Sequence, residues 1–425
     1  MDKAGERRIR EPTITLMPKL LIIGFVWPEP KSSAAGSRMM QLIEAFSTNN
    51  YQIVFASPCA KTENAIDLRS INVTPEDITL NSNSFDSFVK KLRPDVVMFD
   101  RFMMEEQFGW RVAEHCPGAL RILDTEDLHC LRKGRARAFK EGKEFSKAFL
   151  YNDIAKREIA SIYRSDISLI ISEVEMHILE SDFKVDNSLL HYVPFMFNTV
   201  DSAQKLPAFS QRLNFVTIGN FLHEPNYKSV IHLKENIWPL ISEKLPNAEM
   251  HIYGAYSSDK VHQLHNPKDR FLVKGYTPDA NKIMQHARVC LSPLQFGAGL
   301  KGKLFDAMNN GTPCVTSTIG AEGVFGSLQP NGFIEDIPQQ FAEKAIELYH
   351  NEELWNSNQQ NGFEVINSRF RKSTLTRKLI SKVEGTIENL EQHRLQNFMG
   401  SMLHHHSMQS TKFMSRWIAE KNKTN

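Results

Sequence analysis

Short apolar runs alternate with helix-like segments along the first half of the chain. The first run, residues 19–26, is almost continuously apolar, which is typical of a strand buried on both faces of a parallel sheet. A small-residue loop and a helical stretch at 39–46 follow it. Further strands are predicted at 52–56, 95–100, 120–124 and 167–172, with helices at 84–92 and 139–163. This alternation predicts a doubly wound α/β domain over residues 1–195.

The same rhythm restarts after a linker at 193–198. Strands are predicted at 213–218, 248–253, 271–274, 289–293 and 313–316, with helices at 227–241 and 279–287 between them. The pattern predicts a second α/β domain over 196–372. From residue 373, apolar side chains recur at mostly four-residue spacing, which predicts an amphipathic helix over 373–399. Residues 400–425, with the histidines His404–His406, are expected to form a tail rather than a metal cluster.

Composition agrees with two domains and restricts the class of ligand. The 425 residues exceed the roughly 250–300 at which one hydrophobic core stops growing. The 51 Lys and Arg residues against 49 Asp and Glu residues give a net charge of +2, so any anion site has to be local rather than a global surface for nucleic acid. The five scattered cysteines, without a CxxC pair, argue against a disulfide framework or structural zinc.

Targeting signals are not evident in the sequence. Residues 1–19 contain no apolar core of signal-peptide length, and the longest apolar runs fall far short of the roughly 20 residues that cross a bilayer. We therefore expect a cytoplasmic protein, with peripheral contact at the cytoplasmic face of a membrane left open.

The most specific chemical signal is a glycine-rich loop between a predicted strand and a helix, at 292–308. Its glycines allow backbone amides to approach a ligand closely, and the helix N-terminus favours an anion. Two lysines add full charges, and an aspartate one turn later could accept hydrogen bonds from a ribose. The combination suits a nucleoside diphosphate, and the alternative is a tight turn with two solvated lysines. The residues are Gly297, Gly299, Gly302, Lys301, Lys303 and Asp306.

Several segments together resemble the GT-B-fold retaining glycosyltransferases of the glycosyltransferase group 1 (family 4-like) type. The segments are 27–38, 124–129, 172–175, 217–226, 252–254, 296–308 and 311–315. The resemblance implies two Rossmann-like domains facing across a cleft, with a final helix crossing back to the first. It also implies a nucleotide-diphosphate sugar, a UDP- or GDP-sugar, in the second domain and an acceptor in the first. A sugar would move to an acceptor hydroxyl with retention of configuration, without a tightly bound cofactor or metal.

Two departures from the family pattern affect the donor site. Gly299 stands where many members have a glutamate, so contacts to the sugar would come from backbone amides of Ala298–Leu300. Asn220 and Asn226 stand near the positions of a basic pair, so charge neutralisation would shift to the two lysines. The donor-site residues implied are Gly219, Asn220, Gly254, Gly297, Ala298, Gly299, Leu300, Lys301, Lys303 and Asp306.

Candidate catalytic residues follow the predicted strand 120–124, at the sheet edge where α/β proteins bind ligands. Asp124, Asp127 and His129 lie there, and the histidine could change protonation near neutral pH. The resemblance implies that this region contacts the sugar that is transferred. A metal site and a hydrogen-bonded loop histidine are the alternatives.

Acceptor-side candidates lie after other strands of the first domain. The candidates are Gly36, Ser37, Arg38, Asp100 and Glu173. The corresponding structural alternatives are a tight turn, a surface ion pair for Asp100 and a helix cap for Glu173. The basic segment 132–147 could attract a phosphorylated lipid or an anionic glycan, or form a solvated helix face.

The sequence therefore predicts a hexosyltransferase-type enzyme acting on a glycan, lipid-linked or protein acceptor. Two alternatives share its architecture. A nucleotide-sugar epimerase would keep the donor site without an acceptor groove. A non-catalytic binding module is favoured by the missing basic pair at Asn220 and Asn226.

Overall fold

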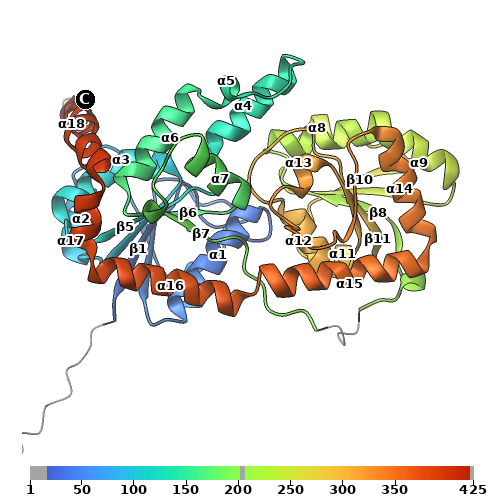
Figure 1. Ribbon diagram of the computed structural model, residues 1–425, viewed down its shortest axis with the longest axis horizontal. Helices are drawn as coiled ribbons and strands as arrows, with labels where there is room; N and C mark the ends of the chain where they lie inside the picture. The colour runs from blue at the N-terminus through green and yellow to red at the C-terminus, as the bar shows by residue number, and fades with distance from the viewer. Residues whose placement is uncertain (1–16, 202–205, 422–425) are drawn as a thin grey trace, which may run out of the picture.

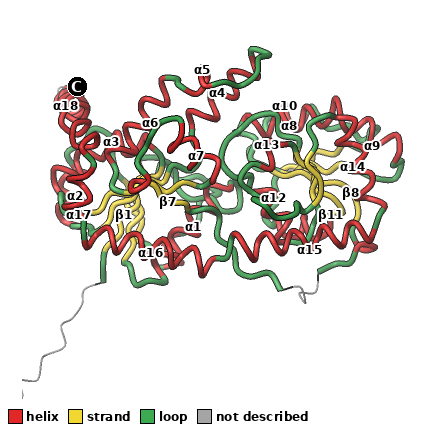
Figure 2. Tube along the Cα trace, in the orientation of Figure 1, coloured by secondary structure: helices red, strands yellow, loops and turns green. Residues whose placement is uncertain are grey.

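The computed structural model describes residues 17–201 and 206–421, which form two α/β domains side by side (Figure 1). Each domain is a parallel sheet covered by helices on both faces, as the layers in Figure 2 show. The predicted fold class, two Rossmann-like domains facing each other, is confirmed.

The first domain holds seven strands in the described residues, in the order β3-β2-β1-β4-β5-β6-β7. Its strands are β1 (Lys19–Ile23), β2 (Gln52–Ser57), β3 (Thr74–Asp77), β4 (Val96–Asp100), β5 (Leu120–Asp124), β6 (Ile167–Ile170) and β7 (Leu190–Tyr192). Its helices are α1 (Ala34–Ser47), α2 (Ser84–Leu92), α3 (Phe102–His115), α4 (His129–Lys140), α5 (Lys147–Leu150), α6 (Asp153–Arg164) and α7 (Glu173–Ser181).

The second domain repeats this topology with six strands in the described part of the chain, ordered β10-β9-β8-β11-β12-β13. The strands are β8 (Leu213–Ile218), β9 (Met250–Tyr253), β10 (Phe271–Gly275), β11 (Ala287–Ser292), β12 (Cys314–Thr316) and β13 (Gly332–Ile334). The helices are α8 (Glu224–His232), α9 (Trp238–Lys244), α10 (Asp259–His262), α11 (Ala280–His286), α12 (Gly302–Asn309), α13 (Thr318–Ala321), α14 (Pro338–His350) and α15 (Glu352–Arg369).

The central strands are apolar on both faces because helices cover both sides of each sheet. All five residues of β4 are buried, and Leu20–Ile23 of β1 are fully buried. Strands β4 and β5 pair in parallel so that Asp100 lies opposite Asp124, at the carboxyl ends of both strands. The sheet therefore places two carboxyl groups side by side at one edge.

The chain crosses between the domains twice, and the two crossings lie side by side. The amide of Phe197 donates to the carbonyl of Phe370 (2.8 Å), and the amide of Lys372 donates to the carbonyl of Phe197 (2.7 Å). After the second crossing, α16 (Lys372–Glu388) runs beneath the first domain, as α15 does beneath the second (Figure 1). Leu375, Leu379, Ile380 and Val383 of α16 enter the core under the first sheet.

One predicted helix is wrong. Residues 139–163 were expected to form a single helix, but α4 ends at Lys140 and α6 begins at Asp153. Gly142 has a φ of +62°, which turns the chain out of the helix, and the Asn152 side chain caps α6 by accepting from the amide of Ala155. The helical periodicity continues across the break, so periodicity alone did not reveal it.

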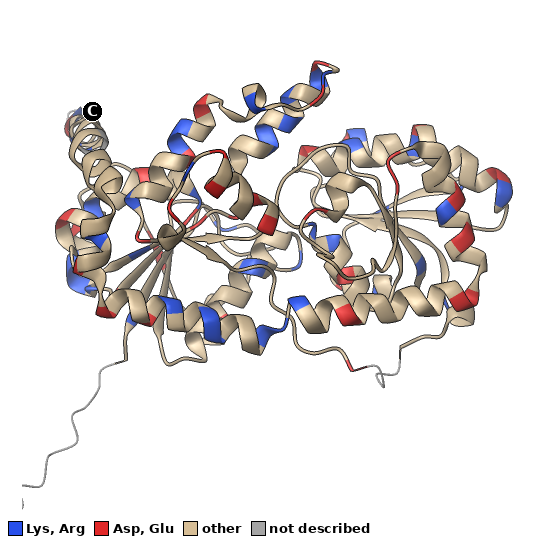
Figure 3. Cartoon of the chain, viewed as in Figure 1, with Lys and Arg blue, Asp and Glu red and all other residues tan. Residues whose placement is uncertain are grey.

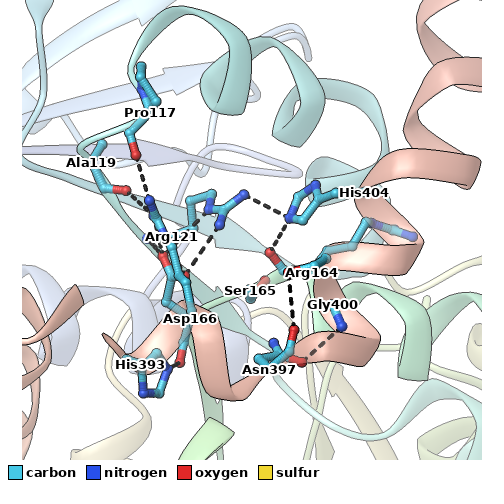
Figure 4. Close-up of polar contacts among 12 residues, drawn as sticks. Pro117, Ala119, Arg121, Arg164, Ser165, Asp166, His393, Asn397, Gly400 and His404 are labelled. Atoms are coloured by element: carbon cyan, nitrogen blue, oxygen red, sulfur yellow. Dashed lines mark hydrogen bonds and ion pairs between the residues drawn. The ribbon is translucent and has the colours of Figure 1, made fainter. Parts of the chain in front are cut away.

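The predicted crossing helix 373–399 is divided, because α16 ends at Glu388 and a second helix, α17 (Leu390–Gln396), follows it. The residues expected to form a tail, 400–425, belong in their described part to a third helix, α18 (Phe398–Lys421), and α17 and α18 lie against the first domain. Asp166, at the start of β6, is the centre of the attachment (Figure 4). Its carboxylate accepts from Nε (2.8 Å) and Nη2 (2.7 Å) of Arg394, and Arg394 also donates to the carbonyl of Ala119 (2.8 Å).

Histidines complete this attachment. Nε2 of His404 lies 2.8 Å from Nη1 of Arg121 and 2.9 Å from the carbonyl of Arg164, and Nε2 of His393 lies 2.7 Å from the carbonyl of Asp166 (Figure 4). At least one of the three predicted tail histidines is thus a packing residue. Among the helices of residues 17–201 and 206–421, none combines the length and the apolar character needed to cross a membrane.

We predict that Arg394→Ala lowers the free energy of unfolding by about 2 kcal/mol, because it removes charge-assisted hydrogen bonds to a buried carboxylate. Burial acts to raise the pKa of Asp166, but the hydrogen bond from Arg394 and the charge of Arg121 outweigh it and lower that pKa. A lowered pKa in the folded state stabilises the protein above the unfolded pKa and is lost as the pH falls through the folded value. The deficit of the variant should therefore be largest at neutral pH and shrink below about pH 4.

Urea unfolding at pH 7 and pH 3 measures both effects. Arg377→Ala, on the exposed face of α16, is the matched control and should leave the urea midpoint unchanged. An Arg394→Ala midpoint equal to the wild-type value at pH 7 would contradict this account of the attachment.

Candidate functional site

The candidate site lies where the carboxyl ends of β4 and β5 meet the glycine-rich loop between β11 and α12. Two non-glycine residues adopt left-handed backbone angles there: Arg101, after β4, has a φ of 72°, and Glu126, after β5, has a φ of 61°. Such conformations cost on the order of 1–3 kcal/mol each and collect at functional sites. The chain therefore turns at Arg101 after β4 and at Glu126 after β5, at the same edge of the sheet.

A buried ion pair holds this edge together. Nη2 of Arg38 lies 2.8 Å from Oδ1 of Asp124, Nε of Arg38 lies 3.2 Å from the same oxygen, and both side chains are buried. Asp100 accepts from the amide of Phe25 (3.0 Å). Arg38 belongs to α1, which begins at Ala34 rather than at the predicted 39. The anion that Arg38 holds in this structure is therefore Asp124.

The next turn of chain carries Asp127 and His129. Oδ2 of Asp127 lies 2.8 Å from Nε of Arg132, and Oδ1 lies 3.5 Å from Nε2 of His129. Burial acts to raise the pKa of Asp127, but Arg132 and His129 lower it to about 2. Burial lowers the pKa of His129 to about 4, so the ring is neutral at pH 7 and the expected change of protonation near neutral pH does not occur in this closed arrangement.

The first turn of α4 is anchored by a buried carboxyl of α6. Glu158 accepts from the amides of His129 (2.9 Å) and Cys130 (3.0 Å). Burial raises the pKa of Glu158 to about 7. These contacts fix the start of α4, and with it the position of the His129 ring against Phe102.

Several buried polar atoms at this edge have no hydrogen-bond partner among the described residues. They include Oδ1 of Asp100, Oδ2 of Asp124, Nε2 of His129 and Oε2 of Glu175. Buried polar atoms are normally hydrogen-bonded, so a group of unpartnered ones marks a place for a polar ligand. Burial and the charge of Asp124 raise the pKa of Glu126, in the same loop, to about 8.

The glycine-rich loop faces this edge from the second domain. Gly297 and Gly299 have φ values of 149° and 63°, and a Cβ at Gly299 would lie 2.9 Å from the Cβ of Asp127. Glycine is therefore required at 299 by both the backbone and the neighbouring domain. Ala298 and Leu300 are buried beside it.

Lys303 is buried and Lys301 is partly buried in the loop. Nζ of Lys301 donates to the carbonyls of Ala298 (3.0 Å) and Gly299 (2.6 Å), and Nζ of Lys303 donates to Oδ1 of Asn226 (3.0 Å). Among the described residues, no carboxylate oxygen lies within ion-pairing distance of either ammonium group. Burial lowers both pKa values to about 8, and raises the pKa of Asp306 to about 6.

Gly219, Asn220 and Gly254 form a group that reaches the glycine-rich loop through Asn226. Nδ2 of Asn226 donates to the carbonyl of Asn220 (2.9 Å), and Nδ2 of Asn220 donates to the carbonyl of Ser32 in the first domain (3.3 Å). A Cβ at Gly254 would lie 1.9 Å from the carbonyl oxygen of Gly219, so the two loops are in contact. Asn226 thus links the loop after β8 to Lys303.

The two domains touch across the site. Arg135 of α4 donates to both carboxylate oxygens of Glu322 (2.6 and 2.7 Å) and to the carbonyl of Gly297 (2.8 Å). Oε1 of Glu175 accepts from the amides of Leu128 (3.1 Å) and Gly299 (2.7 Å). The structure therefore shows a closed arrangement.

The remaining sequence-predicted residues lie away from the centre of the site. Gly36 and Ser37 lie in the first turn of α1, where a Cβ at Gly36 would meet the backbone of Glu29 and Oγ of Ser37 donates to Pro30 (2.9 Å). Glu173 is half exposed and pairs with Arg369 of α15 (2.7 Å). Within the described residues, no group of three or more His, Cys, Asp or Glu side chains is arranged to hold a metal ion.

Sequence reasoning missed several residues that the fold brings into the site. Glu126 and Glu175 lie inside segments that carried the family resemblance, and Arg132 and Arg135 lie inside the basic segment, so each was near a detected signal. His223, at the N-terminus of α8, is a further one: burial lowers its pKa to about 4, and the charge of Asp127 reaches it across the domains. Only the closed arrangement reveals these pairings.

We predict that Arg38→Met destabilises the fold by about 3–5 kcal/mol, because it leaves the Asp124 carboxylate buried without its partner. Urea unfolding measures the loss. The double variant Arg38→Met/Asp124→Asn should recover part of it, since no unpaired charge then stays buried. If Arg38→Met keeps wild-type stability, Arg38 is free to bind a ligand and its structural assignment is wrong.

Comparisons with known proteins agree with this geometry. Residues 212–351 match the model of a family described as glycosyl transferases group 1, and no curated protein sequence matches the chain significantly. HepE of Anabaena in complex with UDP-glucose is similar in structure, with a TM-score of 0.65 and 11% identity over 86% of this chain and 99% of that chain. Sucrose-phosphate synthase of Thermosynechococcus elongatus has a TM-score of 0.62 and 13% identity over 88% of this chain and 100% of that chain.

A TarM variant of S. aureus, in complex with UDP, Fondaparinux and alpha-GlcNAc-glycerol, has a TM-score of 0.56 and 17% identity over 70% of this chain. The match spans 57% of that chain. At these identities the similarity shows the GT-B fold. The family match lies within the second domain.

Proposed function

We propose that the protein is a glycosyltransferase that moves a sugar from a nucleotide-diphosphate sugar to an acceptor hydroxyl, with retention of configuration and without a metal ion. The observation that carries the proposal is the pair of lysines, buried Lys303 and partly buried Lys301, in a glycine-rich loop at the N-terminus of α12. Their desolvated charges have only amide and carbonyl partners in the described residues. An anionic ligand at the loop would compensate both.

The donor half of the site would hold the nucleoside diphosphate. The leaving group of the reaction gains negative charge in the transition state, and preorganised positive groups in a water-excluded site stabilise such charge strongly. Lys301, Lys303 and the amides of the loop would provide this stabilisation, while Asp306 would contact the ribose. Gly297, Ala298, Gly299 and Leu300 would line the diphosphate and sugar, with Gly219, Asn220 and Gly254 against the nucleotide.

The edge that carries Asp124, Asp127 and His129 would face the sugar that is transferred, and Asp100, at the end of the neighbouring strand β4, would lie on the acceptor side. The unpartnered buried oxygens and ring nitrogen of this edge suit the hydroxyl groups of a sugar. Closure of the domains would keep water away from the reacting bond, and water would otherwise hydrolyse the donor. The resemblance supports retention, which the anomeric coupling constant of the product measures by NMR.

The acceptor class in this proposal is a glycan, a lipid-linked sugar or a protein. Basic side chains are spaced along α4 and the loop after it, and this segment projects beside the second domain (Figure 3). Arg135 of this segment pairs with Glu322. Lys143 and Lys147 are largely exposed and pair with Glu141 and Asp182. The exposed lysines would attract an anionic glycan or the phosphates of a cytoplasmic membrane face.

We predict that Lys303→Ala weakens nucleoside diphosphate binding by about 10- to 100-fold, since a hydrogen bond to a charged group contributes about 1.5–3 kcal/mol. Wild-type binding should also weaken as the pH rises above about 8, because Lys301 and Lys303 then lose their protons. Calorimetric titration with UDP, GDP and ADP between pH 6.5 and 9 measures both effects. Lys260→Ala, at the exposed start of α10, is the control.

Transfer itself is tested by incubating the preferred nucleotide sugar with and without acceptor glycans or lipid-linked sugars. Release of nucleoside diphosphate that depends on the acceptor supports the proposal. Conversion of the donor alone into an epimer, or no binding of any nucleoside diphosphate, would contradict it.

A further inference from the structure

Glu175 is a buried carboxyl that lies between the two domains. Glu175 is the third residue of α7, the helix that follows β6, and it is 1% exposed. Its position is set by Ser172, which caps α7 by accepting from the amide of Val174 (3.3 Å). Nothing in the described first domain neutralises it through an ion pair, so its burial calls for another explanation.

One oxygen of Glu175 is held by both domains. Oε1 accepts from the amide of Leu128, which precedes α4, and from the amide of Gly299 in the glycine-rich loop. The two bonds place the carboxyl group between the start of α4 and the glycine-rich loop of the second domain. The contact with the second domain is made by the backbone amide of Gly299, which donates to the carboxyl group of Glu175.

The other oxygen, Oε2, is buried and has no hydrogen-bond partner among the described residues. Asp100, Asp124 and His129 present unpartnered atoms at the same sheet edge. A sugar carries several hydroxyl groups, each able to donate and accept a hydrogen bond, so a sugar satisfies such a set, whereas an apolar ligand does not.

The charges around Glu175 favour a polar but neutral partner. Burial and the charge of Asp127 raise its pKa to about 8, against the opposing effects of the amide hydrogen bonds from Leu128 and Gly299 and of the charge of Lys301. Arg38 and the Cys130 thiol also interact with Glu175. Near neutral pH the carboxyl is largely protonated, so one oxygen accepts while the other can donate. A hydroxyl group pairs with either form.

We propose that Glu175 binds a hydroxyl of the sugar of the donor, and that the amide of Gly299 occupies the place of that hydroxyl in the closed, unliganded protein. The inference rests on the proposed function. It adds a sugar-recognition residue, contributed by the first domain, to a donor site built mainly by the second. Opening of the domains releases the amide of Gly299, and the sugar then takes its position on Oε1 or bonds to Oε2.

The experiment compares nucleoside diphosphates with their sugars. UDP, GDP and ADP and their glucose conjugates are titrated calorimetrically into the wild-type chain, and the pair that binds is used for the variants. Glu175→Ala should weaken binding of the nucleotide sugar at least tenfold and change the affinity for the nucleoside diphosphate by less than twofold. Glu175→Gln keeps an accepting oxygen and a donor in place, and should restore most of the affinity for the sugar. Glu180→Ala, on the same helix, is the matched control.

The outcomes separate the two proposals. If the wild-type chain binds none of the ligands, the proposed function fails and the role of Glu175 fails with it. If the wild-type chain binds a nucleotide sugar but Glu175→Ala weakens the nucleotide and its sugar equally, or weakens neither, the proposed function survives and the inference is wrong. Should Glu175→Ala fail to fold, Glu175→Asp decides, because it draws the carboxyl group back by one methylene: loss of discrimination between the two ligands in a stable Glu175→Asp, with discrimination kept in Glu175→Gln, supports a sugar contact, and unchanged discrimination in Glu175→Asp overturns it.

Discussion

The ion pair between Arg38 and Asp124 fixes the sheet edge on which the candidate site depends. Asp124 ends β5 opposite Asp100 on β4, and both carboxyl groups would repel each other in a buried setting without a cation. Arg38 reaches this point from α1, which is itself the helix that follows β1. The first βα unit of the domain therefore supplies the charge that lets the next two strands end in carboxylates.

Closure of the two domains depends on small residues as well as on charge. A side chain at Gly299 would collide with Asp127, and one at Gly302 would lie 2.7 Å from the Cβ of Ala34. The glycines of the donor loop thus serve two requirements at once: close approach to a ligand and close approach to the opposite domain. Arg135 and Glu175 then cross the interface with hydrogen bonds to the same loop. A ligand has to compete with these contacts when the domains open.

The sequence was sufficient for the fold and for the central strands of both sheets, because buried parallel strands and turn glycines leave strong local signals. The edge strands β3, β7 and β13 were not predicted. The donor loop could be found for the same reason as the central strands. The partners of its residues could not, since Lys303 meets Asn226, 77 positions away, and Gly299 meets Glu175, 124 positions away. Arg38 was expected to face the acceptor. Its pairing with Asp124 was missed, because the contact of a residue on α1 with one on β5 is set by sheet order rather than by local spacing. The break after Lys140 was missed because the helical periodicity continues through Gly142.

The buried lysines connect the energetics of the fold with ligand recognition. Taking an ammonium group out of water is costly, and amide or carbonyl oxygens offset only part of the cost. Lys303, 9% exposed and bonded to one amide oxygen, therefore raises the free energy of the unliganded closed state. A bound diphosphate would remove that penalty, so the same desolvation that lowers the pKa of the lysine increases the gain on binding. Because the net charge of the chain is only +2, its overall charge attracts the anion weakly from a distance, and binding depends on the local lysines.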